Sequence, residues 1–128
     1  MQSEVKRVDK LDEYQTRAMS TRLKSCDNVT YMAFGLVAEV GELADKIAKW
    51  KRKNEVYVSG DRLVFNTWQT GEVDEKHVAL MKELGDVLWF VAGLAEHFGY
   101  SLSEVAEMNL EKLAERKTQG TIVTHENH

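Results

Sequence analysis

The sequence predicts an all-α domain in which four helices form a bundle-like fold, with an irregular insertion between the second and third helices. Three observations support this: the 128 residues contain no proline, long segments repeat apolar residues at helical spacing, and strand-like alternation is confined to one short stretch. A chain of this length suffices for one well-packed domain and is too short for two. We therefore expect a single domain over residues 1–128.

The first two helices are predicted at residues 10–24 and 31–53. Asp9 is a candidate N-cap for the first helix, and the polar residues 25–28 follow it. The second helix carries a long apolar stripe, which predicts an amphipathic helix with one buried face. The stripe consists of Met32, Leu36, Val40, Leu43, Ile47 and Trp50.

Residues 54–73 interrupt the helical pattern with two glycines, β-branched residues and aromatic residues, so we expect a small hairpin or a short helix there. A third helix over residues 74–98 should end at Gly99. The sequence Ser-Leu-Ser-Glu at residues 101–104 is a capping box that opens a fourth helix through Arg116. Residues 118–128 form a polar tail. The inner residues of the third helix are predicted to be Leu80, Leu84, Val87, Val91, Leu94 and Phe98.

Composition excludes several classes of protein. A net charge of -4 argues against a protein built to bind nucleic acid. The single cysteine, Cys26, cannot form an intrachain disulfide, and no Cys/His spacing indicates zinc. No apolar run is long enough to span a membrane, and the first residues lack the apolar stretch of a signal peptide. We therefore expect a cytoplasmic protein without a membrane partner.

Two pairs of carboxylates have the same helical spacing, Glu39-x-x-Glu42 and Glu83-x-x-Asp86, and each pair borders an apolar stripe. Residues three apart lie on one side of a helix. If the two helices face each other, four carboxylates can surround a hard divalent cation, and magnesium carrying a phosphate ligand is the ion we expect. An ordinary solvated helix flank has the same pattern, and periodicity alone does not show that the stripes face one another.

Amide and cationic side chains occupy the corresponding stripe of the fourth helix, where Asn109, Lys112 and Arg116 are suited to binding phosphate. The acidic stripe of the second helix also continues into Lys46, Lys49 and Lys53. We expect at most two of these lysines to reach a substrate, and Lys49 is our candidate. The others are predicted to be surface residues.

Residues 35–46, 82–90 and 109–113 closely resemble the MazG-like family of all-α nucleotide pyrophosphohydrolases, whose hallmark is E-x-x-E followed later by E-x-x-D. The resemblance runs from residue 14 to residue 117. It implies hydrolysis of a ribo- or deoxyribonucleoside triphosphate between the α and β phosphates, giving the monophosphate and pyrophosphate. The implied cofactor is Mg²⁺, with Mn²⁺ as an alternative ion, and the implied role is control or cleaning of the nucleotide pool.

By position, Glu39, Glu42, Glu83 and Asp86 match the metal-binding acids of the family, and the stripe from Asn109 to Arg116 matches its phosphate-binding positions. The metal would orient a water molecule for in-line attack, and one carboxylate would take its proton. Glu39 and Glu42 are our candidates for this base.

Two residues are candidates for the side of the site that binds the base. Gln15 resembles a base-side position in related dimeric pyrophosphatases. Trp68, with Phe65 and Tyr57, supplies either an aromatic face for a base or a small core for the insertion. The insertion lengthens the stretch between the acid pairs relative to compact family members, and we interpret it as a lid, an oligomer contact or a decoration.

We expect a homodimer or homotetramer, because four short helices should leave outer apolar residues such as Trp89 and Phe90 exposed in a monomer. The family resemblance implies the same. Two other classes of protein remain as alternatives: a catalytically silent helical interaction module and a di-iron carboxylate bundle. The di-iron bundle expects Glu-x-x-His pairs, and the sequence contains none.

Overall fold

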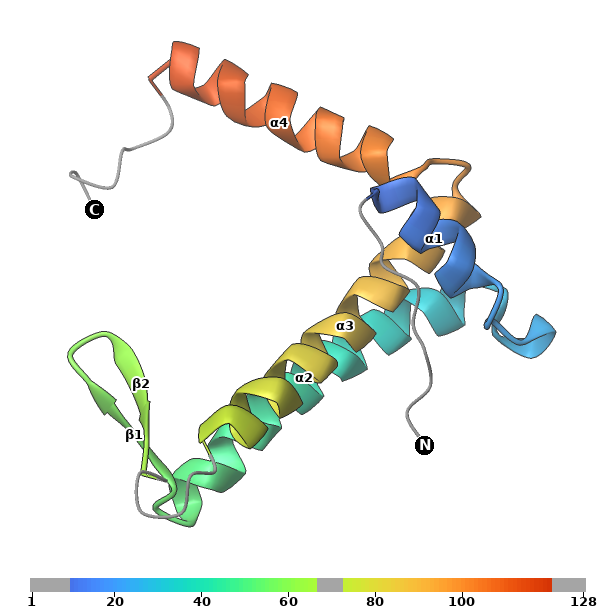
Figure 1. Ribbon diagram of the computed structural model, residues 1–128. Coiled ribbons are helices and arrows are strands. Elements are labelled where there is room, and N and C mark those ends of the chain that lie inside the picture. Colours follow the sequence, from blue (N-terminus) through green and yellow to red (C-terminus); the bar gives the residue numbers. More distant parts are fainter. Residues whose placement is uncertain (1–9, 67–72, 121–128) are drawn as a thin grey trace.

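The computed structural model describes residues 10–66 and 73–120, and it confirms the all-α, four-helix prediction (Figure 1). Two long helices, α2 and α3, lie side by side and run in opposite directions. A β-hairpin fills the described part of the predicted insertion. The elements in order are α1 (Leu11–Met19), a 3₁₀ turn η1 (Lys24–Cys26), α2 (Val29–Arg52), β1 (Val56–Ser59), β2 (Arg62–Phe65), α3 (Val73–His97) and α4 (Leu102–Thr118).

The packing of α2 on α3 depends on two glycines that allow the helices to approach closely. A Cβ atom at Gly35 on α2 would overlap the ring of Phe90 on α3. Likewise, a Cβ atom at Gly93 on α3 would overlap the side chain of Met32 on α2, which is fully buried. Because Gly35 lies one turn before Glu39 and Phe90 lies one turn after Asp86, this contact fixes the helices beside the acidic residues.

The ends of α2 are set by local hydrogen bonds. The side chain of Asn28 accepts a hydrogen bond from the backbone N–H of Tyr31, so the helix begins at Val29 rather than at residue 31. At the other end, Asn54 adopts a left-handed conformation with φ of 60°. The N–H of Glu55 then donates to the carbonyl of Trp50 at 2.8 Å, which is a Schellman closure. This closure fixes the start of the hairpin relative to Trp50.

The boundary between α3 and α4 follows the sequence prediction. Gly99 has a φ of 82°, and the N–H of Tyr100 donates to the carbonyl of Ala95, so α3 ends where a glycine stop was expected. Ser101 and Glu104 form the predicted capping box, with each side chain bound to the backbone N–H of the other residue. The helix then continues two residues beyond the predicted end.

Helix α1 is shorter than predicted, because it ends at Met19 rather than at residue 24. The indole N–H of Trp89 on α3 donates to the carbonyl oxygen of Ala18 and to the hydroxyl of Thr21. The Thr21 hydroxyl itself donates to the Ala18 carbonyl. These side chains supply hydrogen bonds to the Ala18 carbonyl at the end of the helix, so the helix ends there. The predicted cap, Asp9, lies outside the described residues.

Helix α4 diverges from the α2–α3 pair and extends away from it (Figure 1). Only its first turn is well covered, where Leu102 is buried. The expectation that Trp89 and Phe90 are exposed is wrong, because Phe90 is buried between α2 and α3 and Trp89 is partly buried. No described helix has the length and apolar character that crossing a membrane requires.

Other apolar residues of the single chain are exposed instead. Phe34 and Val37 on α2 are 71% and 69% exposed, and Leu110 on α4 is 64% exposed. Several residues predicted as inner ones are exposed as well, because none of the described elements covers that side of the long helices. They are Val40, Leu84 and Phe98.

Candidate active site

The structure brings the two predicted acid pairs together across the α2–α3 contact. Glu39 on α2 and Glu83 and Asp86 on α3 each offer one carboxylate oxygen, and these three oxygens lie within 4.8 Å of one another. The arrangement follows from the sequence, because each pair borders the apolar stripe along which the helices pack. None of the described histidines belongs to the cluster, whereas a di-iron bundle would use histidine ligands.

The electrostatics of this cluster favour a cation. The Oε2 atoms of Glu39 and Glu83 are buried and have no hydrogen-bond partner among residues 10–66 and 73–120. Burial raises the pKa of Glu39 above its usual value, and the nearby charges of Glu42, Asp86 and Glu83 raise it further. Unpaired buried carboxylate oxygens are costly unless an ion or a proton compensates them. Oxygen-only ligands on two rigid helices fit a hard divalent cation such as Mg²⁺.

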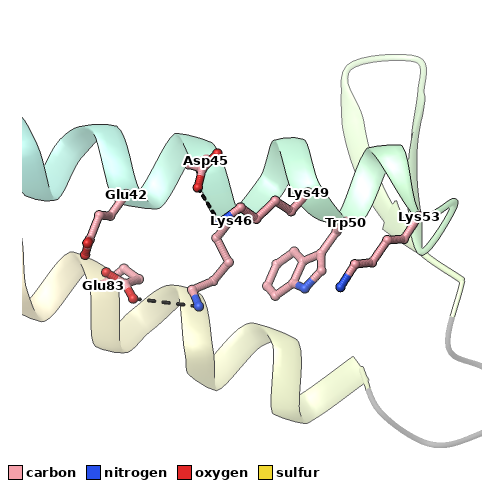
Figure 2. Close-up of a pocket in the computed structure, with 7 residues that line it drawn as sticks. All are labelled: Glu42, Asp45, Lys46, Lys49, Trp50, Lys53 and Glu83. Atoms are coloured by element: carbon pink, nitrogen blue, oxygen red, sulfur yellow. Dashed lines mark ion pairs between the residues drawn. The ribbon is translucent and has the colours of Figure 1, made fainter.

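Glu42 borders this cluster on the side of a neighbouring cavity. It affects the pKa of Glu39 both through its charge and through a side-chain hydrogen bond, so the two carboxyl groups are close. In Figure 2 the side chains of Glu42 and Glu83 point toward each other from α2 and α3. Tyr14 on α1 lies near Asp86. Burial raises the pKa of its hydroxyl, and the charge of Asp86 raises that pKa further.

The cavity lies between α3 and the C-terminal half of α2, and it has a volume of about 300 Å³ (Figure 2). Lys46 extends from α2 toward α3, where its Nζ lies 3.8 Å from Oε1 of Glu83. The Nζ of Lys49 lies 2.9 Å from Oδ2 of Asp45. The cavity therefore combines both signs of charge. It shares Glu83 with the acidic cluster and is also lined by Glu42, Asp45, Lys46, Lys49, Trp50 and Lys53.

The predicted phosphate-binding residues of the fourth helix do not join this site within the single chain. Asn109, Lys112 and Arg116 are exposed on α4, which extends away from the α2–α3 pair (Figure 1). Lys49 borders the cavity as expected for a substrate contact, but Asp45 pairs with its ammonium group. Its role toward phosphate stays a prediction.

The structure describes one of the two base-side candidates, and the role of both toward a base stays a prediction. The Gln15 amide is buried, where it donates to the carbonyls of Ala92 and Tyr100 and accepts from the N–H of Leu102. These bonds join α1, α3 and α4, so the structure gives Gln15 a structural contact and no contact with the cavity. Trp68 lies outside the described residues.

Sequence reasoning missed two aromatic residues beside the site. Trp50 was interpreted as a core or interface residue, yet it lines the cavity. Its position held a signal, because eleven residues complete about three helical turns and place Trp50 on the same side of α2 as Glu39. Tyr14 carried no such signal, since its position near Asp86 depends on how α1 packs on α3.

Comparison with known proteins agrees with this geometry. The model of the MazG nucleotide pyrophosphohydrolase domain matches residues 28–121, which include both acid pairs and the α4 stripe. The chain belongs to the MazG nucleotide pyrophosphohydrolase family. A relative in Mycobacterium phage L5, the Gene 37 protein, is 34% identical over 119 residues and is covered over 92% of its length, with 88% of this chain included. No solved structure matches the chain. Membership of the MazG family supports a hydrolase that acts on nucleotides.

Proposed function

We propose that the protein hydrolyses ribo- or deoxyribonucleoside triphosphates between the α and β phosphates and releases the monophosphate and pyrophosphate. The single observation that carries this proposal is the cluster of Glu39, Glu83 and Asp86, whose three carboxylate oxygens lie within 4.8 Å of one another. Two buried oxygens of this cluster have no hydrogen-bond partner in the described part of the chain, which is the arrangement that a divalent cation would complete. Membership of the MazG family supports the same class of reaction.

Glu39, Glu83 and Asp86, with Glu42 beside them, would hold one or more Mg²⁺ ions. When bound, such an ion neutralises charge on the polyphosphate. In the proposed reaction, a water oxygen forms a bond to the α-phosphorus while the bond from that phosphorus to the bridging oxygen of the β phosphate breaks. Glu39 or Glu42 accepts the proton of the water, and pyrophosphate leaves with the electron pair of the broken bond. This chemistry needs no redox partner.

The proposal also assigns the phosphate contacts to Asn109, Lys112 and Arg116. Within one chain these residues are on a helix that extends away from the acids (Figure 1). We therefore assign them to the acidic cluster of a second copy, so that each site combines α2 and α3 of one chain with α4 of its neighbour. Cationic and amide groups arranged around a metal-bound polyphosphate would supply the positive charge that the acidic cluster lacks.

A homo-oligomer also explains the exposed apolar surface. Phe34, Val37 and Leu110 are each more than 60% exposed in the single chain, which is costly for large apolar side chains on a domain of this size. A second apolar feature is a groove of about 390 Å³ where α2, α3 and the start of α4 meet, lined by Leu36, Val91, Leu94, Ala95, Phe98, Tyr100 and Val105. A second copy of the chain that covers these surfaces would form a dimer or tetramer.

The direct test is a panel of ribo- and deoxyribonucleoside triphosphates incubated with the protein and Mg²⁺, in which pyrophosphate and orthophosphate are measured separately. The proposal predicts stoichiometric release of pyrophosphate and monophosphate, which stops when the metal is chelated. Predominant release of orthophosphate would reject cleavage between the α and β phosphates. Release of neither product from any substrate would favour the silent helical module.

A further inference from the structure

The cavity beside the acidic cluster contains a region that the proposed hydrolysis does not use. Its far end is formed by Trp50 and Lys53. Trp50 follows Glu42 by eight residues, which corresponds to about 12 Å along α2 at 1.5 Å per residue. A substrate whose α-phosphate is held at the acids therefore has an adjoining space into which the rest of the molecule can extend.

The charges in this cavity argue against phosphates as its occupant. Three carboxylates and three lysines line it, but Glu42 and Glu83 would be engaged by the cation, so the pairing of the lysines decides what the rest of the cavity can bind. Two of the lysines are already paired, Lys46 with Glu83 at 3.8 Å and Lys49 with Asp45 at 2.9 Å. Lysines that are already paired offer less positive charge to a polyphosphate, whereas the mixture of donors and acceptors suits an uncharged polar group. A nucleobase with its sugar is such a group.

The wall at the far end is aromatic and is held in place by its neighbours. The Phe65 ring of the hairpin meets the Trp50 indole edge-on, with their centroids 5.9 Å apart. Lys76 of α3 places its Nζ 5.7 Å from the indole centroid and pairs with Glu55 at 3.8 Å. His77 supports Phe65 from α3, with ring centroids 4.7 Å apart. Contacts from the hairpin and from α3 thus preorganise the indole at the edge of the cavity.

We propose that this cavity binds the nucleoside part of the substrate and that the base stacks on Trp50. The inference rests on the proposed hydrolysis of nucleotides and deepens it by naming the residue that contacts the base. Phe65 acts as a positioning residue, because it reaches the substrate only through Trp50. The hairpin, which carries Phe65, then contributes to base selectivity. Lys49 contacts the nucleoside rather than the phosphates.

The test measures binding by calorimetry with two kinds of probe in the presence of Mg²⁺: nucleoside monophosphates of the common bases, and inorganic tripolyphosphate, which has no nucleoside. Stacking on an aromatic side chain changes affinity by about 5- to 150-fold. Trp50→Leu should weaken the best-bound monophosphate by a factor in this range, while Trp50→Phe, which keeps a ring, should weaken it less. The affinity for tripolyphosphate should stay within about twofold in both variants, because the acids and the cation would be unchanged.

A matched control is Trp89→Phe, since that indole bonds to Ala18 and Thr21 near the end of α1 and does not line the cavity. It should leave both affinities unchanged. Phe65→Leu should change the relative affinities for monophosphates of different bases without weakening the binding of tripolyphosphate. Phe65→Tyr, which keeps a ring, should have the relative affinities of the wild type.

Three results would overturn the inference: equal weakening of both probes by Trp50→Leu, no weakening of the monophosphate, or no monophosphate binding by the wild-type protein. Pyrophosphate release is scored separately. A failure of the proposed hydrolysis and a failure of the base site therefore give different results.

Discussion

The α2–α3 pair carries the predicted metal-binding acids and helix α4 carries the predicted phosphate-binding residues, but only the acids come together within one chain. The acids of α2 and α3 meet within one chain, because two long helices pack along the stripes that the acids border. The phosphate-binding candidates of α4 are exposed on a helix that extends away from them (Figure 1). The position of a residue on the flank of a helix depends on what that helix packs against, and most of α4 is exposed among the described residues.

The largest expected effect concerns the acidic cluster of α2 and α3. Asp86→Asn removes one negative charge from the cluster on α3, and we expect turnover to fall at least a thousandfold because the cation site would be lost. The fold should survive, since the substitution relieves repulsion among the carboxylates. Turnover is measured as pyrophosphate release, and folding by circular dichroism and thermal melting.

Asp61→Asn is a suitable control for that variant. Asp61 is an exposed residue in the turn of the hairpin and does not belong to the cluster. Its substitution by asparagine removes the same single negative charge. It should retain wild-type turnover. Wild-type rates from Asp86→Asn would show that the acidic cluster is not the site of reaction.

The next effect concerns α4. The double variant Lys112→Ala/Arg116→Ala should raise KM by about 10- to 100-fold with a smaller change in kcat, because each lost phosphate contact mainly weakens binding of the substrate. The measurement is steady-state pyrophosphate release over a range of substrate concentrations. An unchanged KM would place the phosphate contacts elsewhere.

Mixing this double variant with Asp86→Asn separates the two possible arrangements of the site. If α4 serves the neighbouring chain, a mixed dimer contains one intact site, and random exchange should restore about a quarter of wild-type activity at low substrate concentration. If α4 serves its own chain, every site carries a defect. A mixture no more active than the average of its two components would therefore contradict completion of the site by a neighbour.

A smaller effect tests the packing that brings the acids together. Gly35→Ala should destabilise the protein by about 1–3 kcal/mol, because the new methyl group would overlap the Phe90 ring. Gly85→Ala is the matched control, since a Cβ atom there would meet none of the described atoms within 4 Å. Alanine favours a helix over glycine by up to about 1 kcal/mol, so this control should be neutral or more stable. Urea unfolding measures both, and equal stabilities would show that the close approach of the helices is unimportant.

The smallest expected effect is a dependence of stability on pH in the metal-free protein. Because the pKa of Glu39 is raised in the folded state, first by burial and then by Glu42, Asp86 and Glu83, the native state holds this proton more tightly than the unfolded chain does. Native stability should therefore fall as pH rises above the usual glutamate value of 4.5 and then level off above the raised pKa.

Glu39→Gln removes this titrating group. Its melting temperature relative to wild type should increase with pH across that window in the presence of a chelator. Addition of Mg²⁺ should stabilise the wild type and narrow the difference. A difference in melting temperature that does not change with pH would contradict the crowding of the carboxylates.

Much of this arrangement could be predicted from local sequence signals. The stop at Gly99 and the capping box at Ser101 were predictable because each is decided by residues a few positions apart. The early end of α1 was not, since it depends on the indole of Trp89, which is distant in sequence. The acid pairs were found from spacing, but periodicity could not show that the stripe at Lys112 would diverge from them. That outcome depends on packing between residues that are distant in sequence.

The most direct test of the account is the affinity for Mn²⁺, measured by electron paramagnetic resonance on the wild type and on one variant from each helix, Glu39→Gln on α2 and Asp86→Asn on α3. Substitution of groups that only support metal ligands already weakens binding by about 10- to 100-fold, so loss of a ligand should cost at least tenfold in each variant. The account predicts that either substitution alone removes tight binding, because the two helices share the ion. Wild-type affinity in either variant would contradict it.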